Sequence, residues 1–390
     1  MAAIDWGAIR AAEFPVADAW AYFDHAAVAP IPNRAALAIA RWAGNQAVNG
    51  ATEWPVWGGR IGTLREDLAT WIGAEPAEIA FVANTTHGIG LVAEGFPWRP
   101  GDNVVVPADE YPSNVYPWMN LTDRGVETRL VPSRDDRILI DDVRDAMDDR
   151  TRVLAVSHVE FATGFRNDLD ALGTLCRERG VALCLDAIQG VGPFVLDVKK
   201  TPVDFAAADS HKWLLGPEGA GFLYVRREWI ERLRPIGVGW NSVVGSFAAG
   251  GLDFTLKPDA RRWEGGSWNM PGLQGFAASM TLLREIGREA FSARLLERAD
   301  AVRETVAAAG WRVVGPSAPH ERSAIVTAAA DGVDPDAAVG ILRSRRVVAS
   351  RRRGRLRLSP HVYTDSSDLL RLHDALVVAL GGDDAPGKVL

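Results

Sequence analysis

The stretch AADSHKWLLGPEGAGFLYV, residues 207–225, decides the fold, because two apolar, strand-like runs enclose a lysine and a glycine-rich turn. Lysine is strongly hydrated and is rarely fully buried without a partner. Lys212 stands between a small apolar run and the tight segment WLLGPEGAG. A desolvated lysine has a lowered pKa and a more nucleophilic amine, so this placement favours Schiff-base formation over a solvated loop lysine.

Outward from this stretch, the chain alternates short apolar runs with helix-like stretches between residues 60 and 225. Near-continuous apolar runs of this length suit strands that are buried on both faces of a sheet. Such alternation predicts an α/β domain with a mostly parallel, seven-stranded sheet. The seven runs are IAFV (79–82), NVVVP (103–107), TRLV (128–131), VLAVS (153–157), VALCLD (181–186), DFAAA (204–208) and AGFLYV (220–225).

The pattern changes after residue 275 to long helix-like segments followed by shorter strands. We therefore expect a large domain over residues 22–274. A smaller α+β domain is expected from residues 1–21 together with 275–384. The small, polar residues 385–390 are expected to form a loose tail.

The bulk composition excludes several classes of protein. The 390 residues are 47% hydrophobic and 24% charged, with a formal net charge of −7. This balance argues against nucleic-acid and membrane-surface binding. The two cysteines imply no disulfide framework, the N-terminus resembles no secretion signal, and no apolar run could span a bilayer. We expect a cytoplasmic protein.

Polar residues stand where the predicted strands end, which is where ligands bind in open α/β sheets. Thr85 and Thr86 fall at a helix start, a geometry that binds phosphate. Asp186 ends a buried strand, where a carboxylate is costly without a partner such as a protonated pyridine nitrogen. Taken alone, each group is better explained as a cap, of the helix for Thr85 and Thr86 and of the following turn for Asp186. Together with Lys212 they match the phosphate, ring nitrogen and aldehyde of pyridoxal phosphate.

The chain resembles the class V aminotransferase family of fold-type I pyridoxal-phosphate enzymes, which includes cysteine desulfurases and isopenicillin N epimerase-like proteins. Six motifs carry this resemblance, in the family's order, over nearly the whole chain. They are YFDHAAVAPIP (22–32), ANTTHGI (83–89), EYPSNVYPW (110–118), LDAIQGVG (185–192), SHKWLLGPEGAG (210–221) and GRLRLSPHVYT (354–364).

The resemblance implies a role for each matched residue. Lys212 would hold the cofactor and move protons at the substrate α-carbon, with Asp186 and Tyr111 as its catalytic companions. The cofactor-binding residues implied are Thr85, Thr86 and His211 at the phosphate, Tyr111 stacked on the ring, Asp186 at the ring nitrogen, Gln189 near the ring oxygen, and Asp209.

Two further groups follow from the same resemblance. Gly266 and Ser267, in WEGGSWN, would touch the phosphate of a partner subunit, which implies a homodimer with shared active sites. Arg357 would bind the substrate α-carboxylate, a task that suits the guanidinium fork, and His25 would also contact substrate. His158 and Glu160 have no second histidine at ligand spacing, so no metal site is expected.

These residues favour an enzyme that acts at the α-carbon of an amino acid, with transamination first, C–S or other β-elimination second and epimerisation third. Phe161 stands where desulfurases have asparagine, and no cysteine follows Cys184, so persulfide-forming desulfuration is not expected. Two other classes stay open: a non-catalytic scaffold, and a nicotinamide dehydrogenase suggested by the glycines at 88 and 90. The arginines at 351–355 are expected to be solvated or to help bind an anionic substrate.

Overall fold

The computed structural model describes residues 4–246 and 251–381. Its largest sheet has seven strands in the order β2-β8-β7-β6-β5-β3-β4. The strands are β2 (Ile79–Val82), β3 (Asn103–Pro107), β4 (Glu127–Val131), β5 (Thr151–Ser157), β6 (Ala182–Asp186), β7 (Phe205–Asp209) and β8 (Gly221–Val225). All seven coincide with apolar runs of the sequence.

The sheet is mainly parallel, as predicted. Strands β7, β6, β5, β3 and β4 run parallel to one another, whereas β8 is antiparallel to both β7 and β2. Continuous burial explains why six of these runs are apolar nearly throughout rather than alternating, whereas in β4, at the end of the strand order, only Val131 is buried. Successive residues of β6 contribute to two cores on opposite faces: Leu183 and Leu185 to one, Cys184 to the other.

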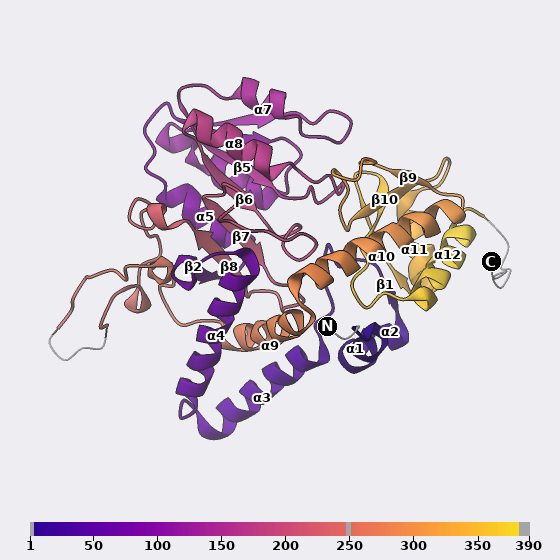
Figure 1. Ribbon diagram of the computed structural model, residues 1–390, viewed down its shortest axis with the longest axis horizontal. Coiled ribbons are helices and arrows are strands. Elements are labelled where there is room, and N and C mark those ends of the chain that lie inside the picture. The colour runs from indigo at the N-terminus through magenta and orange to yellow at the C-terminus, as the bar shows by residue number, and fades with distance from the viewer. Residues whose placement is uncertain (1–3, 247–250, 382–390) are drawn as a thin grey trace.

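Helices cover both faces of this sheet (Figure 1). Helix α5 packs on one face, and α4, α8 and α9 contribute to the core on the other. The helices before the change of pattern are α1 (Trp6–Glu13), α2 (Val16–Ala19), α3 (Asn33–Asn49), α4 (Trp54–Ile72), α5 (Thr85–Gly95), α6 (Tyr116–Met119), α7 (Ile140–Ala146) and α8 (Leu169–Arg179).

The C-terminal part, orange to yellow in Figure 1, lies to one side of the large sheet. It contains an antiparallel sheet in the order β12-β13-β10-β9. Its elements are α9 (Met270–Ile286), α10 (Arg288–Ala308), β9 (Arg312–Val314), β10 (Val326–Ala329), α11 (Pro335–Ser344), β11 (Val347–Val348), β12 (Ser350–Arg352), β13 (Arg355–Leu358) and α12 (Ser366–Ala379).

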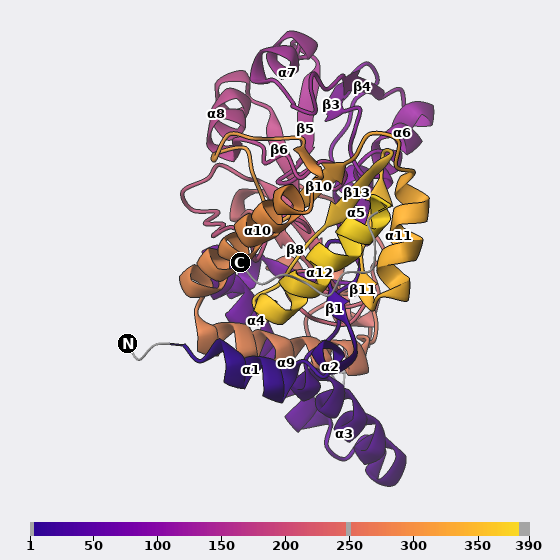
Figure 2. The same ribbon diagram turned by 90° about the vertical axis from the view of Figure 1, so that its right-hand side faces the viewer.

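The N-terminal segment is tied to this C-terminal part. The short strand β1 (Ala21–Tyr22) pairs in parallel with β11, and Asp24 bridges to Ser359. Figure 2 shows β1 and β11 side by side below the C-terminal strands. This pairing brings the motif at 22–32 next to the motif at 354–364, which are more than 300 residues apart.

The domain boundaries stay a prediction. Helix α9, which crosses the expected boundary at 274, packs against α3 and α4 as well as against α10. Residues 385–390, predicted as a tail, lie outside the described residues.

Candidate active site

A cavity of about 440 Å³ lies at the carboxyl ends of β6 and β7 and at the start of α5. It gathers residues from all six motifs of the sequence, and it also includes Arg352. The predicted site residues that line it are Thr85, Thr86, Tyr111, Asp186, Gln189, Asp209, His211, Lys212 and Arg357.

Lys212 lines this cavity, three residues after β7 ends. The side chain is only 9% exposed. No hydrogen-bond acceptor for Nζ occurs among the described residues, and the amine lies 5.7 Å from the centre of the Tyr111 ring. Burial lowers the pKa of Lys212 to about 8, although the nearby charge of Asp186 raises it. A large fraction of this amine is therefore neutral and nucleophilic near pH 8.

Asp186 ends β6 and is 2% exposed. One carboxylate oxygen accepts a hydrogen bond of 3.1 Å from the backbone N–H of Ile188. Burial raises the pKa of Asp186 to about 6, and the charge of Lys212 opposes this rise. At pH 7 to 8 the residue is mostly ionised, so it presents a buried negative charge to the cavity.

Two buried glutamates lie near Asp186, and sequence reasoning did not assign either a role in the site. Glu110 accepts hydrogen bonds from the backbone and hydroxyl of Ser157, which pairs with Asp186 in the sheet. Burial raises the pKa of Glu110 well above its usual range and that of Glu160 to about 8. Glu160 is therefore mostly neutral at pH 7, whereas Asp186, with a pKa of about 6, is mostly ionised, and burial shifts the pKa of Glu110 in the same direction as that of Glu160.

The start of α5 provides a site for an anion at the other end of the cavity. The side chain of Asn84 accepts from the N–H of His87, and the first intrahelical bond is that of Gly88, so the N–H groups of Thr85 and Thr86 stay available. Such free N–H groups at a helix start bind phosphate. The Thr86 hydroxyl also lies 2.6 Å from that of Ser113.

Close packing against the sheet, rather than dinucleotide binding, explains the glycine at position 88. A Cβ atom at Gly88 would lie 2.8 Å from the Cβ of Ala207 in β7. The glycine therefore allows α5 to pack closely on the sheet, which directs the helix start at the cavity.

His211 and Tyr111 complete the walls. Nδ1 of His211 lies 2.9 Å from the carboxylate of Asp209. Tyr111 is 47% exposed, and its ring meets that of Phe161 edge-on at 5.1 Å. Gln189 donates to the carbonyl of Ala26 and accepts from the indole of a tryptophan, each at 2.9 Å, which fixes the amide.

Arg357 lies on β13 and lines the same cavity, with its side chain almost fully buried. Its guanidinium donates to the carbonyl of Phe161 at 2.9 Å and to the carboxylate of Asp24 at 3.0 Å. Its Nε has no partner among the described residues. Burial lowers the pKa of Arg357 to about 10, while Asp24 raises it. Asp24 was not predicted as a site residue, although it stands inside the first motif of the resemblance.

The structure does not bring three predicted residues to the cavity. Both ring nitrogens of His25 are engaged, one with the carbonyl of Ser359 and one with the hydroxyl of Tyr363, each at 2.8 Å. Gly266 and Ser267 are exposed and lie outside the cavity. Their predicted contacts, with substrate and with a partner subunit, stay predictions.

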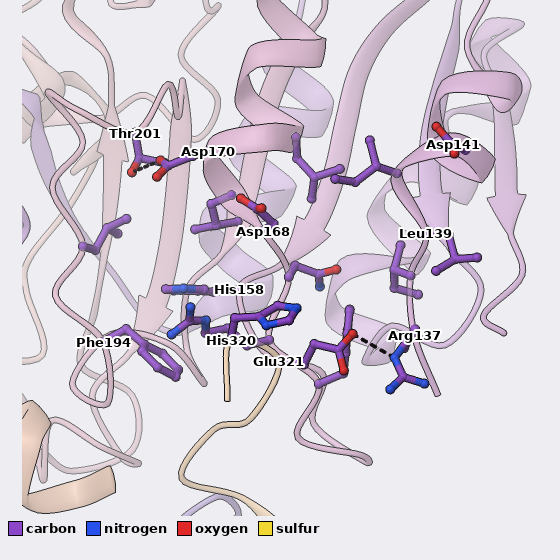
Figure 3. Close-up of a pocket in the computed structure, with 18 of the residues that line it drawn as sticks. Arg137, Leu139, Asp141, His158, Asp168, Asp170, Phe194, Thr201, His320 and Glu321 are labelled. Carbon is purple, nitrogen blue, oxygen red and sulfur yellow. Dashed lines mark hydrogen bonds and ion pairs between the residues drawn. The ribbon is translucent and has the colours of Figure 1, made fainter. Parts of the chain in front are cut away.

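A larger cavity, of about 760 Å³, is lined by residues between 137 and 201 together with His320 and Glu321 (Figure 3). Its polar side chains largely pair with one another, as Arg137 does with Glu321 at 2.8 Å and Thr201 with Asp170 at 2.9 Å. Burial lowers the pKa of His158, which lines it, to about 3. This cavity contains no lysine near a buried carboxylate, so we place the candidate active site at Lys212.

The chain belongs to the class-V aminotransferase family, whose sequence model matches residues 21–362. One relative, a probable cysteine desulfurase of Methanothermobacter thermautotrophicus, is 35% identical over 58% of this chain and 56% of its own length. An uncharacterized aminotransferase of Bacillus subtilis is 28% identical over 80% of this chain and 82% of its own length. The chain thus spans a little over half the length of the desulfurase relatives it matches.

Among solved structures, a complex of a cystine C–S lyase superposes with a TM-score of 0.87. The match covers 93% of this chain and 99% of that one, at 24% identity, and so shows the shared fold. The family match confirms the family recognised in the sequence and, with it, the prediction of a pyridoxal-phosphate-dependent enzyme. The free N–H groups at α5, the buried Asp186 and the unbonded Lys212 amine fit the phosphate, ring nitrogen and aldehyde of that cofactor.

None of the helices that the structure describes combines the length and apolarity needed to cross a bilayer.

Proposed function

We propose that this chain catalyses a pyridoxal-phosphate-dependent reaction, transamination in the first place, at the α-carbon of an amino acid with a free α-carboxylate. One observation carries the proposal: the buried amine of Lys212 has no hydrogen-bond acceptor among the described residues and shares its cavity with Asp186 and Arg357. Lysine that is desolvated in this way suits covalent attachment to a carbonyl.

The cofactor would be held at both ends. Thr85, Thr86 and His211 would bind its phosphate, and Asp186 would pair with its ring nitrogen. Tyr111 would cover one face of the ring, with Gln189 at the ring oxygen. When bound, pyridoxal phosphate withdraws electrons from the substrate α-carbon and so acidifies its proton.

The chain's own residues then orient the substrate and move this proton. Arg357, fixed by Asp24 and the carbonyl of Phe161, holds the α-carboxylate. Lys212 accepts the proton from the α-carbon, which requires a neutral amine, and a pKa of about 8 makes that form available at pH 7 to 8. In transamination, the protonated amine of Lys212 would then give up this proton again, so that one residue would serve as base and as acid.

The test combines a spectrum with an assay. The purified protein is expected to absorb in the visible, and borohydride reduction followed by mass spectrometry is expected to place the cofactor on Lys212. A panel of amino acids with a keto-acid acceptor is expected to yield keto acid and new amino acid. Attachment at another lysine, or a colourless protein that fails to bind added cofactor, would contradict the proposal.

β-Elimination is the second candidate, favoured by the burial of both cysteines. Cysteine desulfurase and cystine C–S lyase occur among the relatives and structural neighbours. Cys176 and Cys184 are each 1% exposed, and neither lines the cavity. A chain without a thiol in its site can still eliminate a sulfur substituent, releasing pyruvate rather than alanine. Pyruvate together with sulfide from cysteine, or with cysteine persulfide from cystine, without a keto-acid acceptor, distinguishes this reaction from transamination.

The active unit is proposed to be a cytoplasmic homodimer. The segment with Gly266 and Ser267 is exposed, and beside it Trp54, 46% exposed, stacks on Trp268 with ring centres 6.3 Å apart. Exposed aromatic surface of this kind favours a partner. Light scattering at assay concentration tests this proposal, and an active monomer would contradict it.

A further inference from the structure

Arg352 differs from the other arginines of the β12–β13 hairpin. In the part of the chain that the structure describes, its guanidinium has no carboxylate partner and donates only to the backbone carbonyl of Arg351, at 2.7 Å. Each of the three neighbours pairs with an aspartate: Arg351 with Asp336 at 2.6 Å, Arg353 with Asp109 at 2.5 Å, and Arg355 with Asp136 at 2.5 Å.

The register of the hairpin directs Arg352 to the active site. Ser350 lies opposite Arg357, and Arg352 opposite Arg355. Cross-strand partners share a face, and alternate residues of one strand share it too, so Arg352 and Arg357 lie on the same face. Both line the cavity that contains Lys212.

The turn of the hairpin is fixed to the large domain. Arg353 and Gly354 have φ values of 49° and 69°, the left-handed conformation of a two-residue hairpin turn. The ion pair between Arg353 and Asp109 fixes this turn next to the large sheet's loop. Asp109 stands two residues before Tyr111, which lines the cavity. Arg352, next to the turn, is therefore held in the cavity wall and is partly buried rather than free in solvent.

One lysine and two arginines line the cavity, namely Lys212, Arg352 and Arg357. The charge of Arg352 lowers the pKa values of Lys212 and Arg357, although burial is the larger cause for both. Arg357 already has Asp24 as a partner, and one α-carboxylate adds only one negative charge. A half-buried arginine without a counter-ion, near two other cations, is stabilised by a second anion.

We propose that Arg352 binds an acidic group on the substrate side chain, so that the enzyme acts on amino acids with a second carboxylate or a comparable anion. This inference rests on the proposed function. Arg357 holds the α-carboxylate and Arg352 the distal one, each through the guanidinium fork, which matches a carboxylate with two hydrogen bonds. Substrates with one carboxylate leave Arg352 without its partner and bind more weakly.

The test measures binding without turnover. The holoenzyme is titrated calorimetrically with the dicarboxylates succinate and glutarate and with the monocarboxylate butyrate. Three proteins are compared: the parent, Arg352→Gln, and Arg351→Gln, whose arginine is exposed and does not line the cavity. We expect the better dicarboxylate to bind the parent at least 10-fold more tightly than butyrate. Arg352→Gln is expected to remove that preference and Arg351→Gln to retain it.

Equal affinity of the parent for mono- and dicarboxylates would overturn the inference. So would an Arg352→Gln variant that weakens both ligands by the same factor, because that result assigns Arg352 to the shared carboxylate. Turnover separates this inference from the proposed function. If neutral amino acids react faster than acidic ones, the inference fails and the proposed function stands. If no amino acid reacts, the proposed function fails, while the titration still decides the role of Arg352.

Discussion

The carboxyl-terminal edge of the large sheet, where β6 and β7 end, is called the sheet edge below. This sheet edge and the β12–β13 hairpin contribute to one cavity, yet their charged residues lie in different surroundings. Asp186 and Lys212 stand at or just after ends of strands that are buried on both faces. The arginines of the hairpin stand on a small antiparallel sheet, and most of them pair with aspartates at the surface. Burial is the main influence on the charged groups of the first region, and ion pairs are the main influence on those of the second.

This difference separates reactivity from selectivity. Burial shifts the pKa values of Asp186 and Lys212 toward neutrality, to about 6 and about 8, which suits groups that bind a ring nitrogen and exchange protons. Ion pairs at the hairpin leave arginines charged and fixed in direction, which suits recognition of carboxylates. Substitutions at the sheet edge should therefore affect the chemical step, and substitutions at the hairpin should affect which substrate binds.

Lys212→Ala is expected to have the largest effect. It removes both the attachment point and the base, so kcat should fall by at least about 10⁴-fold. The measurement is single-turnover kinetics together with mass spectrometry after borohydride reduction. Lys200→Ala is the matched control, because that lysine is 84% exposed and pairs with Asp197. Comparable loss in both variants would remove the distinction between the sheet edge and the surface.

Asp186→Asn follows, with two opposite consequences. Loss of the negative partner of the ring nitrogen should lower kcat by about 10²- to 10³-fold, because a neutral amide no longer favours the protonated ring. Without cofactor, the variant should be more stable than the parent. Because the folded-state pKa of Asp186 is raised, its charged form destabilises the fold above about pH 6, and stability is regained as the pH falls through that value.

Urea unfolding of the apo-protein at pH 8 and at pH 5 measures this contribution. The difference between Asp186→Asn and the parent should be roughly 1–3 kcal/mol at pH 8, and it should shrink toward pH 5. A variant that is less stable than the parent at both values would contradict the assigned desolvation.

Arg357→Gln should act mainly on binding. Removal of one member of a buried, hydrogen-bonded charge pair costs a few kcal/mol, so KM should rise about 30- to 100-fold with a smaller change in kcat. Asp24→Asn is the companion variant, since it keeps the guanidinium and can still accept its 3.0 Å hydrogen bond but lacks the negative charge of the carboxylate. It should raise KM less than Arg357→Gln does. A fall in kcat at unchanged KM would instead place Arg357 in the chemical step.

The sequence predicted the sheet edge better than the hairpin, for a physical reason. Strands buried on both faces leave a continuous apolar run, so the positions of Asp186 and Lys212 at their ends can be read directly. The contact of Arg357 with Asp24 joins residues 333 positions apart, and no local pattern reveals it. The same holds for Arg352, whose neighbours in sequence are also arginines and differ from it only in their aspartate partners.

His25 shows the limit of carrying a motif to single side chains. Its motif does reach the cavity, through Ala26, Ala27 and Val28. The imidazole itself points into the core, where it bonds to Ser359 and Tyr363. Burial lowers its pKa to about 3, so it stays neutral at physiological pH. Which residue of a motif faces the ligand depends on backbone direction, and the sequence alone does not supply that.

The smallest effect is expected from the two cysteines, although one of them lies two residues before Asp186. Cys184 belongs to β6, but its side chain points into the core formed with α5, because successive residues of a strand face opposite sides of the sheet. Burial raises the pKa of the Cys176 thiol to about 12 and that of Cys184 further. A desulfurase needs a thiolate that can reach the substrate sulfur, and these thiols are neither ionised nor near the cavity.

The double variant Cys176→Ala, Cys184→Ala should therefore keep kcat/KM within about twofold of the parent, at a stability cost of about 1 kcal/mol for each small cavity. With cysteine as substrate, any product should be pyruvate in both proteins, because elimination needs no enzyme thiol. Product analysis by chromatography, with a persulfide-specific dye, makes the measurement. Alanine and persulfide formed by the parent, and absent from the variant, would show that a buried thiol reaches the site. In that case position along a strand would no longer separate reactive residues from inert ones.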